Sequence, residues 1–361
     1  MMRNRGTSLL GTIFALAWLA GCGGSSSSRH SAYVALPQAN AIAAFRVNTD
    51  SGDFKPVLGS PFSGGTSPVS ILMHPSGKFI YAANQGGSDI SLFTIDSSTG
   101  ELSEKMPRTA AGLNPTSLAI DSGGDLLFAT NEVSNNISVY SISSSDGTLT
   151  QIAGSPFPTG ARPVALALSP SGKFLYVASA NLGVVFGYSV ASGGSSLLAV
   201  PGSPFGVGSG PLSLTVDPSE HFLYVANTIS NTVSGMVIDP SSGTLTAASR
   251  SPFATATGPI SVTVHPSGKF LYVANLGSNN VSAYSIDTTT GATTQLGKSP
   301  FAAGTGPEFA IVDPSGKFLY VCNQSSKNIT KFQIDQDTGG LPSSTISVTM
   351  NLAPTSMVFT K

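Results

Sequence analysis

The chain has 361 residues, a formal net charge of −1 and only 10% charged residues. This composition lacks the basic face expected of a nucleic-acid-binding protein, so we expect no nucleic-acid partner. Forty glycines and 24 prolines without a Gly-X-Y period indicate many turns, and the apolar residues that recur throughout argue against a disordered chain.

The first 22 residues have the pattern of an export signal. Arg3 and Arg5 precede an apolar run over residues 9–20, which is too short to span about 30 Å of hydrocarbon. The sequence LAGC that ends at Cys22 resembles the bacterial lipobox, in which the cysteine is lipidated and becomes the mature N-terminus. We therefore predict a lipoprotein signal peptide over residues 1–22; a plain secretory signal with a chance cysteine is the alternative.

Residues 23–30, GGSSSSRH, are typical of a flexible tether. Together with Cys22 they predict an exported, membrane-anchored lipoprotein on the periplasmic face of the outer membrane or at the cell surface. The other cysteine, Cys322, stands where copies of a repeat have alanine. It is therefore predicted to be a small buried residue without a disulfide partner.

The segment HPSGKFIYAAN at residues 74–84 begins a repeat. Near copies start at residues 121, 169, 217, 265 and 313, so the period is 47 or 48 residues. A fixed period of this length predicts a stacked or circular repeat architecture.

One unit of the repeat, residues 260–301, divides into four strands. Residues 260–264 alternate apolar and small polar side chains, HPSG has the Pro and Gly of a type I turn, and residues 270–274 are almost continuously apolar, as in a strand buried on both faces. Residues 281–286 alternate again, an Asp-initiated turn follows, and a weaker strand near residues 293–296 precedes a recurring SPF. The sequence DQDTGG at residues 335–340 occupies the same turn, so we interpret it as a turn rather than a calcium loop. Four-stranded units of this length are typical of propeller blades.

Both ends of the chain hold parts of one further blade. Residues 31–66 supply its second, third and fourth strands, and residues 350–361 supply its first strand. The sequence therefore predicts an all-β, seven-bladed β-propeller over residues 31–361, with four antiparallel strands per blade. Pairing of the C-terminal strand with the N-terminal blade would close the ring and remove exposed sheet edges. We expect a monomer.

These motifs resemble those of the lactonase family of seven-bladed propellers, which includes 6-phosphogluconolactonase-like proteins and fungal carboxymuconate-cyclising enzymes. The resemblance rests on HPSGKFLYVAN, NNVSAYSID and TGxL at a period near 48 and covers residues 31–361; YVTN-type surface repeats are similar within LYVAN. It implies a site at the mouth of the central channel, where family enzymes have roughly GPRH opening a first strand and NE after the second. Here Asn131 and Glu132 match NE, whereas Thr116 and Ser117 stand where Arg and His would be.

If the family geometry applies, the two residues after each blade's proline line the channel. The first ring is Val69, Thr116, Val164, Leu212, Ile260, Glu308 and Thr355, and the second is Ser70, Ser117, Ala165, Ser213, Ser261, Phe309 and Ser356. Neither ring holds Arg or His, and Glu308 is their only carboxylate. The candidate ligand-binding residues are therefore Ser117, Ser213, Ser261 and Phe309 in the rings, with Asn131 and Arg162 at the mouth.

Histidine would be the ordinary general base for opening a lactone. His30 lies in the tether, His74 and His265 begin repeat turns, and His221 replaces an exposed Lys, so each is expected to be structural. A His-dependent hydrolase is thereby disfavoured, and the catalytic candidates that remain are Glu132 and Glu308. The chain has no Walker loop, HExxH, GxSxG or CxxC sequence, and we predict no metal and no cofactor.

Two hypotheses follow. The first is an exported, lipid-anchored binding or scaffold module with a degenerate lactonase site, whose face takes a small polar ligand, a glycan or a protein. The alternative is a 6-phosphogluconolactonase-like lactone hydrolase that uses Glu132 and Glu308, with Arg162 meeting an anionic substrate. The missing Arg–His pair favours the first hypothesis, and so does an exported location, because phosphorylated sugar intermediates are cytoplasmic.

Overall fold

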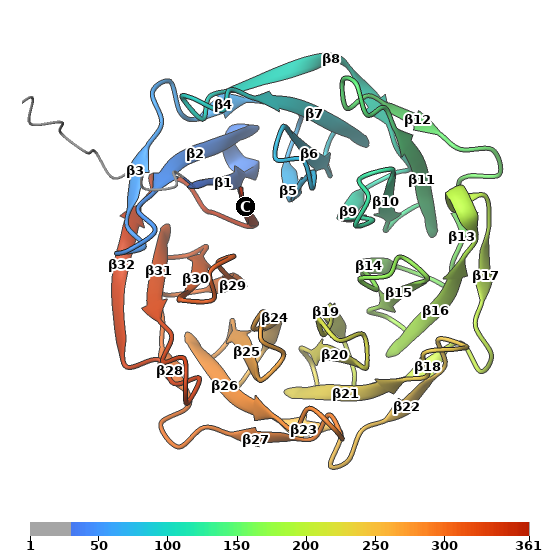
Figure 1. The fold of residues 1–361 in the computed structure, drawn as a ribbon, viewed down its shortest axis with the longest axis vertical. Coiled ribbons are helices and arrows are strands. Elements are labelled where there is room, and N and C mark those ends of the chain that lie inside the picture. The colour runs from blue at the N-terminus through green and yellow to red at the C-terminus, as the bar shows by residue number, and fades with distance from the viewer. Residues whose placement is uncertain (1–29, 361) are drawn as a thin grey trace, which may run out of the picture.

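Seven antiparallel sheets stand around a central axis in the computed structural model, which describes residues 30–360 (Figure 1). The prediction of an all-β, seven-bladed propeller is confirmed. Helical structure within the described residues is limited to two 3-10 turns, η1 (Pro37–Ala39) and η2 (Ser192–Gly194). Neither these nor any other part of that range forms a helix long and apolar enough to cross a membrane.

The blades are numbered in chain order, and their strands are given from the axis outward. The first three are β33 (Met357–Phe359), β1 (His30–Leu36), β2 (Ala41–Val47), β3 (Phe54–Pro56); β5 (Pro68–Met73), β6 (Phe79–Asn84), β7 (Asp89–Ile95), β8 (Leu102–Ala110); and β9 (Pro115–Ile120), β10 (Leu126–Asn131), β11 (Asn136–Ile142), β12 (Leu149–Gln151). The fourth and fifth are β14 (Pro163–Leu168), β15 (Phe174–Ser179), β16 (Val184–Val190), β17 (Leu197–Ala199); and β19 (Pro211–Val216), β20 (Phe222–Asn227), β21 (Thr232–Ile238), β22 (Leu245–Ala247). The sixth and seventh are β24 (Pro259–Val264), β25 (Phe270–Asn275), β26 (Asn280–Ile286), β27 (Thr293–Gln295); and β29 (Pro307–Val312), β30 (Phe318–Asn323), β31 (Asn328–Gln333), β32 (Ser343–Thr349). In five blades the SPF motif adds a two-residue strand beside the third strand: β4 (Phe62–Ser63), β13 (Phe157–Pro158), β18 (Phe205–Gly206), β23 (Phe253–Ala254) and β28 (Phe301–Ala302).

The second strand is the most deeply buried part of a blade. Every residue of β6, β10, β15, β20, β25 and β30 is buried, as their apolar sequences predict. Their side chains pack between neighbouring sheets; one core cluster, for example, joins β20 and β21 to β24, β25 and β26. Each blade therefore buries its faces against the blades beside it, which explains why the chain repeats one unit.

The C-terminal strand closes the ring on the N-terminal blade, as predicted. Val34 pairs with Met357 and Ala32 pairs with Phe359 in an antiparallel β1–β33 ladder. The sequence places His30 in the predicted tether, residues 23–30. In the structure His30 is instead the first residue of β1, where it pairs with Val47. The predicted signal peptide, Cys22 and the rest of the tether lie outside the described residues.

The repeated tyrosine supplies a hydrogen bond between blades. In six blades the tyrosine of the second strand is fully buried, and its hydroxyl donates to the carbonyl of a turn glycine in an adjacent blade at 2.7–3.1 Å. The pairs are Tyr33–Gly100, Tyr81–Gly147, Tyr176–Gly243, Tyr224–Gly291, Tyr272–Gly339 and Tyr320–Gly52. The last pair crosses the ring closure, and the third blade has Phe128 at this position.

Two of the repeat's histidines also connect blades. His74 is buried, and its Nε2 donates to the carbonyl of Gly124 in the next blade (3.0 Å), while its Nδ1 accepts the backbone N–H of Ser76. His265 makes the same contacts with Gly316 and Ser267. His221 is exposed. The contacts of His74 and His265 and the exposure of His221 agree with the sequence-based expectation that none of the three is catalytic.

An aspartate begins the turn between the third and fourth strands of most blades. The carboxylate of Asp239 accepts the backbone N–H groups of Ser241 (2.9 Å) and Ser242 (2.8 Å). Hydrogen bonds from Ser241, first through its hydroxyl, and from Ser242 lower the pKa of Asp239 to about 2. Asp335 of the DQDTGG sequence accepts the N–H groups of Asp337 and Thr338 in the same way, so it caps a turn.

Candidate functional site

The first strand of six blades enters the channel wall through a β-bulge. In β29 the register against β30 shifts between Pro307 and Phe309, which leaves Glu308 as the extra residue. The strands β5, β9, β14, β19 and β24 have the same shift after their proline. A bulge redirects the side chains beside it, and here the extra residue and the one after it both reach the channel.

The channel holds a cavity of about 420 Å³ on the axis, walled by the first strands of all seven blades. All fourteen residues of the two rings that the family resemblance predicts line it. In the part of the chain that the structure describes, the lining consists of aliphatic and hydroxyl-bearing residues and Met357, together with Glu308, its only charged residue, and Phe309, its only aromatic one. No histidine, lysine or arginine among residues 30–360 contributes to this wall.

The serines proposed as ligand contacts already take part in contacts between blades. The Oγ atoms of Ser117, Ser213 and Ser261 each accept a backbone N–H from the first strand of the next blade, at 3.4, 3.1 and 3.1 Å. These bonds use oxygen lone pairs only. Each hydroxyl hydrogen can therefore still be donated to a molecule in the channel.

Glu308 is a carboxylate without a protein partner. No ion pair or hydrogen bond joins its side chain to another residue within 30–360, although it lies in the channel wall. Burial raises the pKa of Glu308, because the charged form loses hydration. Burial, and secondarily the charge of Glu308, raises the pKa of the Cys322 thiol on the neighbouring β30. Cys322 is fully buried and free, as predicted.

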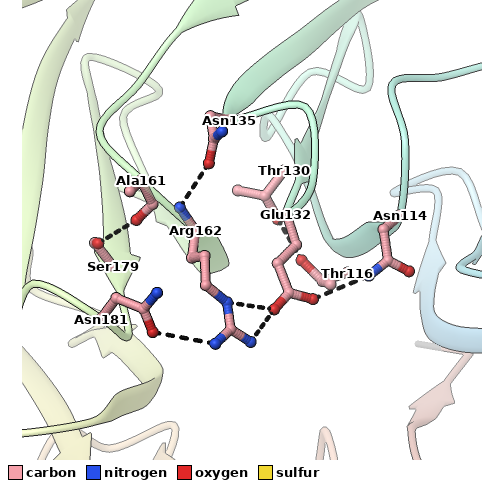
Figure 2. Close-up of polar contacts among 9 residues, drawn as sticks. All are labelled: Asn114, Thr116, Thr130, Glu132, Asn135, Ala161, Arg162, Ser179 and Asn181. Atoms are coloured by element: carbon pink, nitrogen blue, oxygen red, sulfur yellow. Dashed lines mark hydrogen bonds and ion pairs between the residues drawn. The ribbon is translucent and has the colours of Figure 1, made fainter.

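Glu132 and Arg162 form an ion pair between the third and fourth blades, beside the end of the channel at which the first strands begin (Figure 2). Arg162 donates from Nε (2.9 Å) and Nη2 to Oε1 of Glu132, and Asn114 donates from Nδ2 to the other carboxylate oxygen (3.1 Å). Asn181 accepts from Nη1 of Arg162 at 3.1 Å. Both oxygens of Glu132 and all three guanidinium nitrogens of Arg162 are thus engaged.

The backbone positions both members of this pair. Glu132 follows β10 directly, and its N–H donates to the carbonyl of Asn114. Arg162 precedes Pro163 of β14 with a positive φ of 54°, and its N–H donates to Oδ1 of Asn135 at 2.8 Å. The Glu132 side chain is only 13% exposed, whereas that of Arg162 is 51% exposed. The carboxylate is therefore covered by the arginine, which itself faces solvent.

Asn131 is placed differently from the other predicted ligand contacts. It is fully buried, and its Nδ2 donates to Asn136 (2.7 Å) and Ser138 (2.9 Å). A Cβ on Gly112 would lie 2.6 Å from Cγ of Asn131, so the loop before β9 closes directly over this side chain. Equivalent donor bonds and close glycines recur in other blades, at Asn84, Asn227 and Asn323.

Apart from the buried Asn131, the structure divides the candidate residues into two groups. Glu308, Phe309 and the three serines line the channel, and Glu132 and Arg162 pair in the loops between two blades. No ion pair or hydrogen bond among the described residues joins Glu308 to either member of the pair. An acid–base pair of Glu132 and Glu308 is therefore not assembled by direct contact.

Two residues of this site were not expected from the sequence. Asn114 and Asn181 hold Glu132 and Arg162 in place, yet the sequence patterns gave neither of them a role in the site. The signal that could have found Asn114 is its position directly before a blade proline, where other blades have serine, glycine, arginine or alanine. Such a difference between copies marks a residue that the common architecture does not require.

The comparison with known families agrees with the architecture. A family model described as "Lactonase, 7-bladed beta-propeller" matches residues 25–165 and 158–359. The chain belongs to this lactonase family. No curated protein matches its sequence.

Solved structures with the same fold include three relatives of low sequence identity. A Bacteroides uniformis protein provisionally named a 6-phosphogluconolactonase is 21% identical (TM-score 0.80, 92% of this chain and 99% of that one). A Bacteroides fragilis protein with the same provisional name is 23% identical (TM-score 0.79, 93% and 99%). The periplasmic gluconolactonase PpgL of Pseudomonas aeruginosa is 19% identical (TM-score 0.79, 92% and 99%). At these identities the likeness to the three solved structures concerns the fold.

Proposed function

We propose that the protein is an exported, lipid-anchored binding module that takes a small polar ligand into its central channel. The observation that carries the proposal is the channel itself. Its volume of about 420 Å³ lies within the range of small-molecule sites, and its wall offers serine and threonine hydroxyls among aliphatic side chains. Polar and apolar groups share this wall, and polar groups set among apolar side chains can fix the orientation of a small ligand.

The side chains near the channel favour binding over hydrolysis. A general base must reach the proton that it removes, and the wall holds no imidazole in the described range. Both carboxylate oxygens of Glu132 already accept hydrogen bonds, from Arg162 and from Asn114, so part of the acceptor capacity of this carboxylate is used within the protein. Glu308 has free oxygens but no neighbouring cation to stabilise an oxyanion.

One observation favours the alternative of a lactone hydrolase. Glu132 stands at the family's NE position, and Arg162 supplies from the next blade a guanidinium that the family motif would place at Thr116. Proteins of the same fold carry lactonase names. In this alternative Arg162 would bind an anionic lactone and Glu132 would act after that contact opens.

Lactone hydrolysis by the full-length protein, extracted in detergent, separates the two functions. We expect the rates with glucono-, phosphoglucono- and muconolactone to equal the buffer rate. A rate above buffer that falls by about 100-fold or more in Glu132→Gln would instead establish the hydrolase, since general acid–base groups typically contribute that much. Asp337→Asn, which removes an exposed carboxylate from a turn of the seventh blade, is the matched control.

The proposed anchor rests on the N-terminal sequence. The apolar run before Cys22 and the Gly/Ser-rich residues after it are the pattern of a lipidated, tethered protein. The P. aeruginosa protein of the same fold is named as periplasmic, which is compatible with export of this chain.

A further inference from the structure

We infer that the ligand of the channel is a small organic cation, an ammonium compound whose positive charge pairs with Glu308. This inference rests on the proposed function, because it names the chemical class of the ligand for the same channel. It is argued from a comparison of the blades with one another, from the missing partner of Glu308 and from the remaining wall.

The other blades show that the fold does not require a carboxylate at this position. Residue 308 is the extra residue of a β-bulge, and five further blades build the same bulge with Val69, Thr116, Val164, Leu212 and Ile260. Phe309 likewise stands where the other blades have serine or alanine. Two adjacent departures from the repeat thus occur at one point of the channel wall.

Glu308 also lacks the partner that a partly buried charge needs. Burial of an ionised carboxylate is unfavourable unless a cation or several donors compensate it. No side-chain cation lines the channel in the described part of the chain, and none of the ion pairs there includes Glu308. A positively charged ligand would supply the missing charge.

The rest of the wall distinguishes an organic cation from a metal ion. Calcium takes six to eight oxygen ligands, and residues 30–360 contain no cluster of three metal-ligating side chains. Phe309 lies next to Glu308 on β29, and an aromatic ring attracts ammonium groups through its face. Leu212 and Ile260 offer apolar contacts for the hydrocarbon part of such a molecule.

The test is a binding panel measured by calorimetry and thermal shift on the detergent-extracted protein. The panel pairs choline with its neutral isostere 3,3-dimethylbutan-1-ol and ethanolamine with ethylene glycol, and adds methyl glucoside and gluconate as neutral and anionic polar ligands. Each is measured on the wild type, Glu308→Gln, Glu308→Val and Asp337→Asn. Glu308→Val gives the position the residue of the second and fourth blades, so it is compatible with the fold.

The inference predicts that an ammonium compound binds about tenfold or more tightly than its neutral isostere. Both Glu308 variants should remove this difference, and Asp337→Asn should keep it. If a neutral or anionic member binds and Glu308→Gln does not change its affinity, the inference is overturned while the proposed function stands. An ammonium compound that binds both Glu308 variants as tightly as it binds the wild type would likewise overturn the inference and leave the proposed function standing. If no member of any class binds, both the inference and the proposed function fail.

Discussion

The hydrogen bond from Tyr224 to Gly291 should contribute measurably to the stability of the ring. Tyr224 is fully buried, and its hydroxyl donates to the Gly291 carbonyl of the next blade at 3.1 Å. Tyr224→Phe keeps the aromatic side chain in place but leaves the Gly291 carbonyl without its hydrogen-bond donor. Removing one partner of a buried hydrogen bond costs about 1–3 kcal/mol. We expect this loss in the free energy of unfolding, measured by equilibrium urea denaturation followed by circular dichroism.

A matched control is available in the fourth blade. Tyr188 is also buried, and burial raises its pKa to about 12, but no hydrogen bond involves its hydroxyl among the described residues. Tyr188→Phe should therefore change stability by less than about 0.5 kcal/mol. Tyr320→Phe removes the equivalent bond across the ring closure and should cost as much as Tyr224→Phe. A loss in Tyr224→Phe no larger than that in Tyr188→Phe would refute the assignment of these bonds as connections between blades.

Three further predictions concern other parts of the chain. Gly243→Ala should lower the free energy of unfolding by about 2 kcal/mol or more, because the new Cβ would lie 2.4 Å from Cδ1 of Phe174 at a φ of +74°. Gly268→Ala has a similar φ of +73° but open space around the Cβ, so it should lose only the backbone strain of about 1–2 kcal/mol in the same urea assay. Burial raises the pKa of Glu308 in the folded protein above 4.5. The wild type should therefore lose stability relative to Glu308→Gln as the pH rises from about 4.5 through that folded-state pKa. A difference between the unfolding midpoints of the two proteins that is the same at about pH 4 and about pH 7 would contradict this. Cys22→Ser should abolish incorporation of radiolabelled palmitate, and unchanged labelling would rule out the lipobox.

The period of the repeat made most of the fold predictable. The period predicts the number of blades, the strands within one blade and the split first blade. These follow from sequence spacing because every blade repeats the same apolar strand and the same turns. The residues that line the channel were predicted instead from the resemblance to the lactonase family, and the structure has a bulge after the proline at the same register in six blades.

The contacts between blades were beyond reach of the sequence. Ser213 is expected to face the channel, but its acceptance of the Val262 N–H depends on how far two sheets are rotated about the axis. Glu132 and Arg162 lie 30 residues apart in different blades, and only the joint geometry of two loops shows that each engages the other. Spacing alone therefore suggested three separate charged candidates, whereas the structure has one satisfied pair and one isolated carboxylate.

The contrast between the satisfied pair and the isolated carboxylate indicates how a functional residue can be recognised in a repeat protein. The tyrosine of the second strand, which six of the seven blades share, joins neighbouring blades, and its hydroxyl finds its hydrogen-bond partner there. A residue that differs from its copies without gaining a partner is not explained by the architecture. Glu308 meets both conditions, because five bulged blades place an uncharged residue at its position and no described side chain pairs with it. The isolated charge is disfavoured by burial in the free protein, and a cationic ligand would offset that cost, so affinity for a cation and a lower stability of the empty channel have the same physical origin.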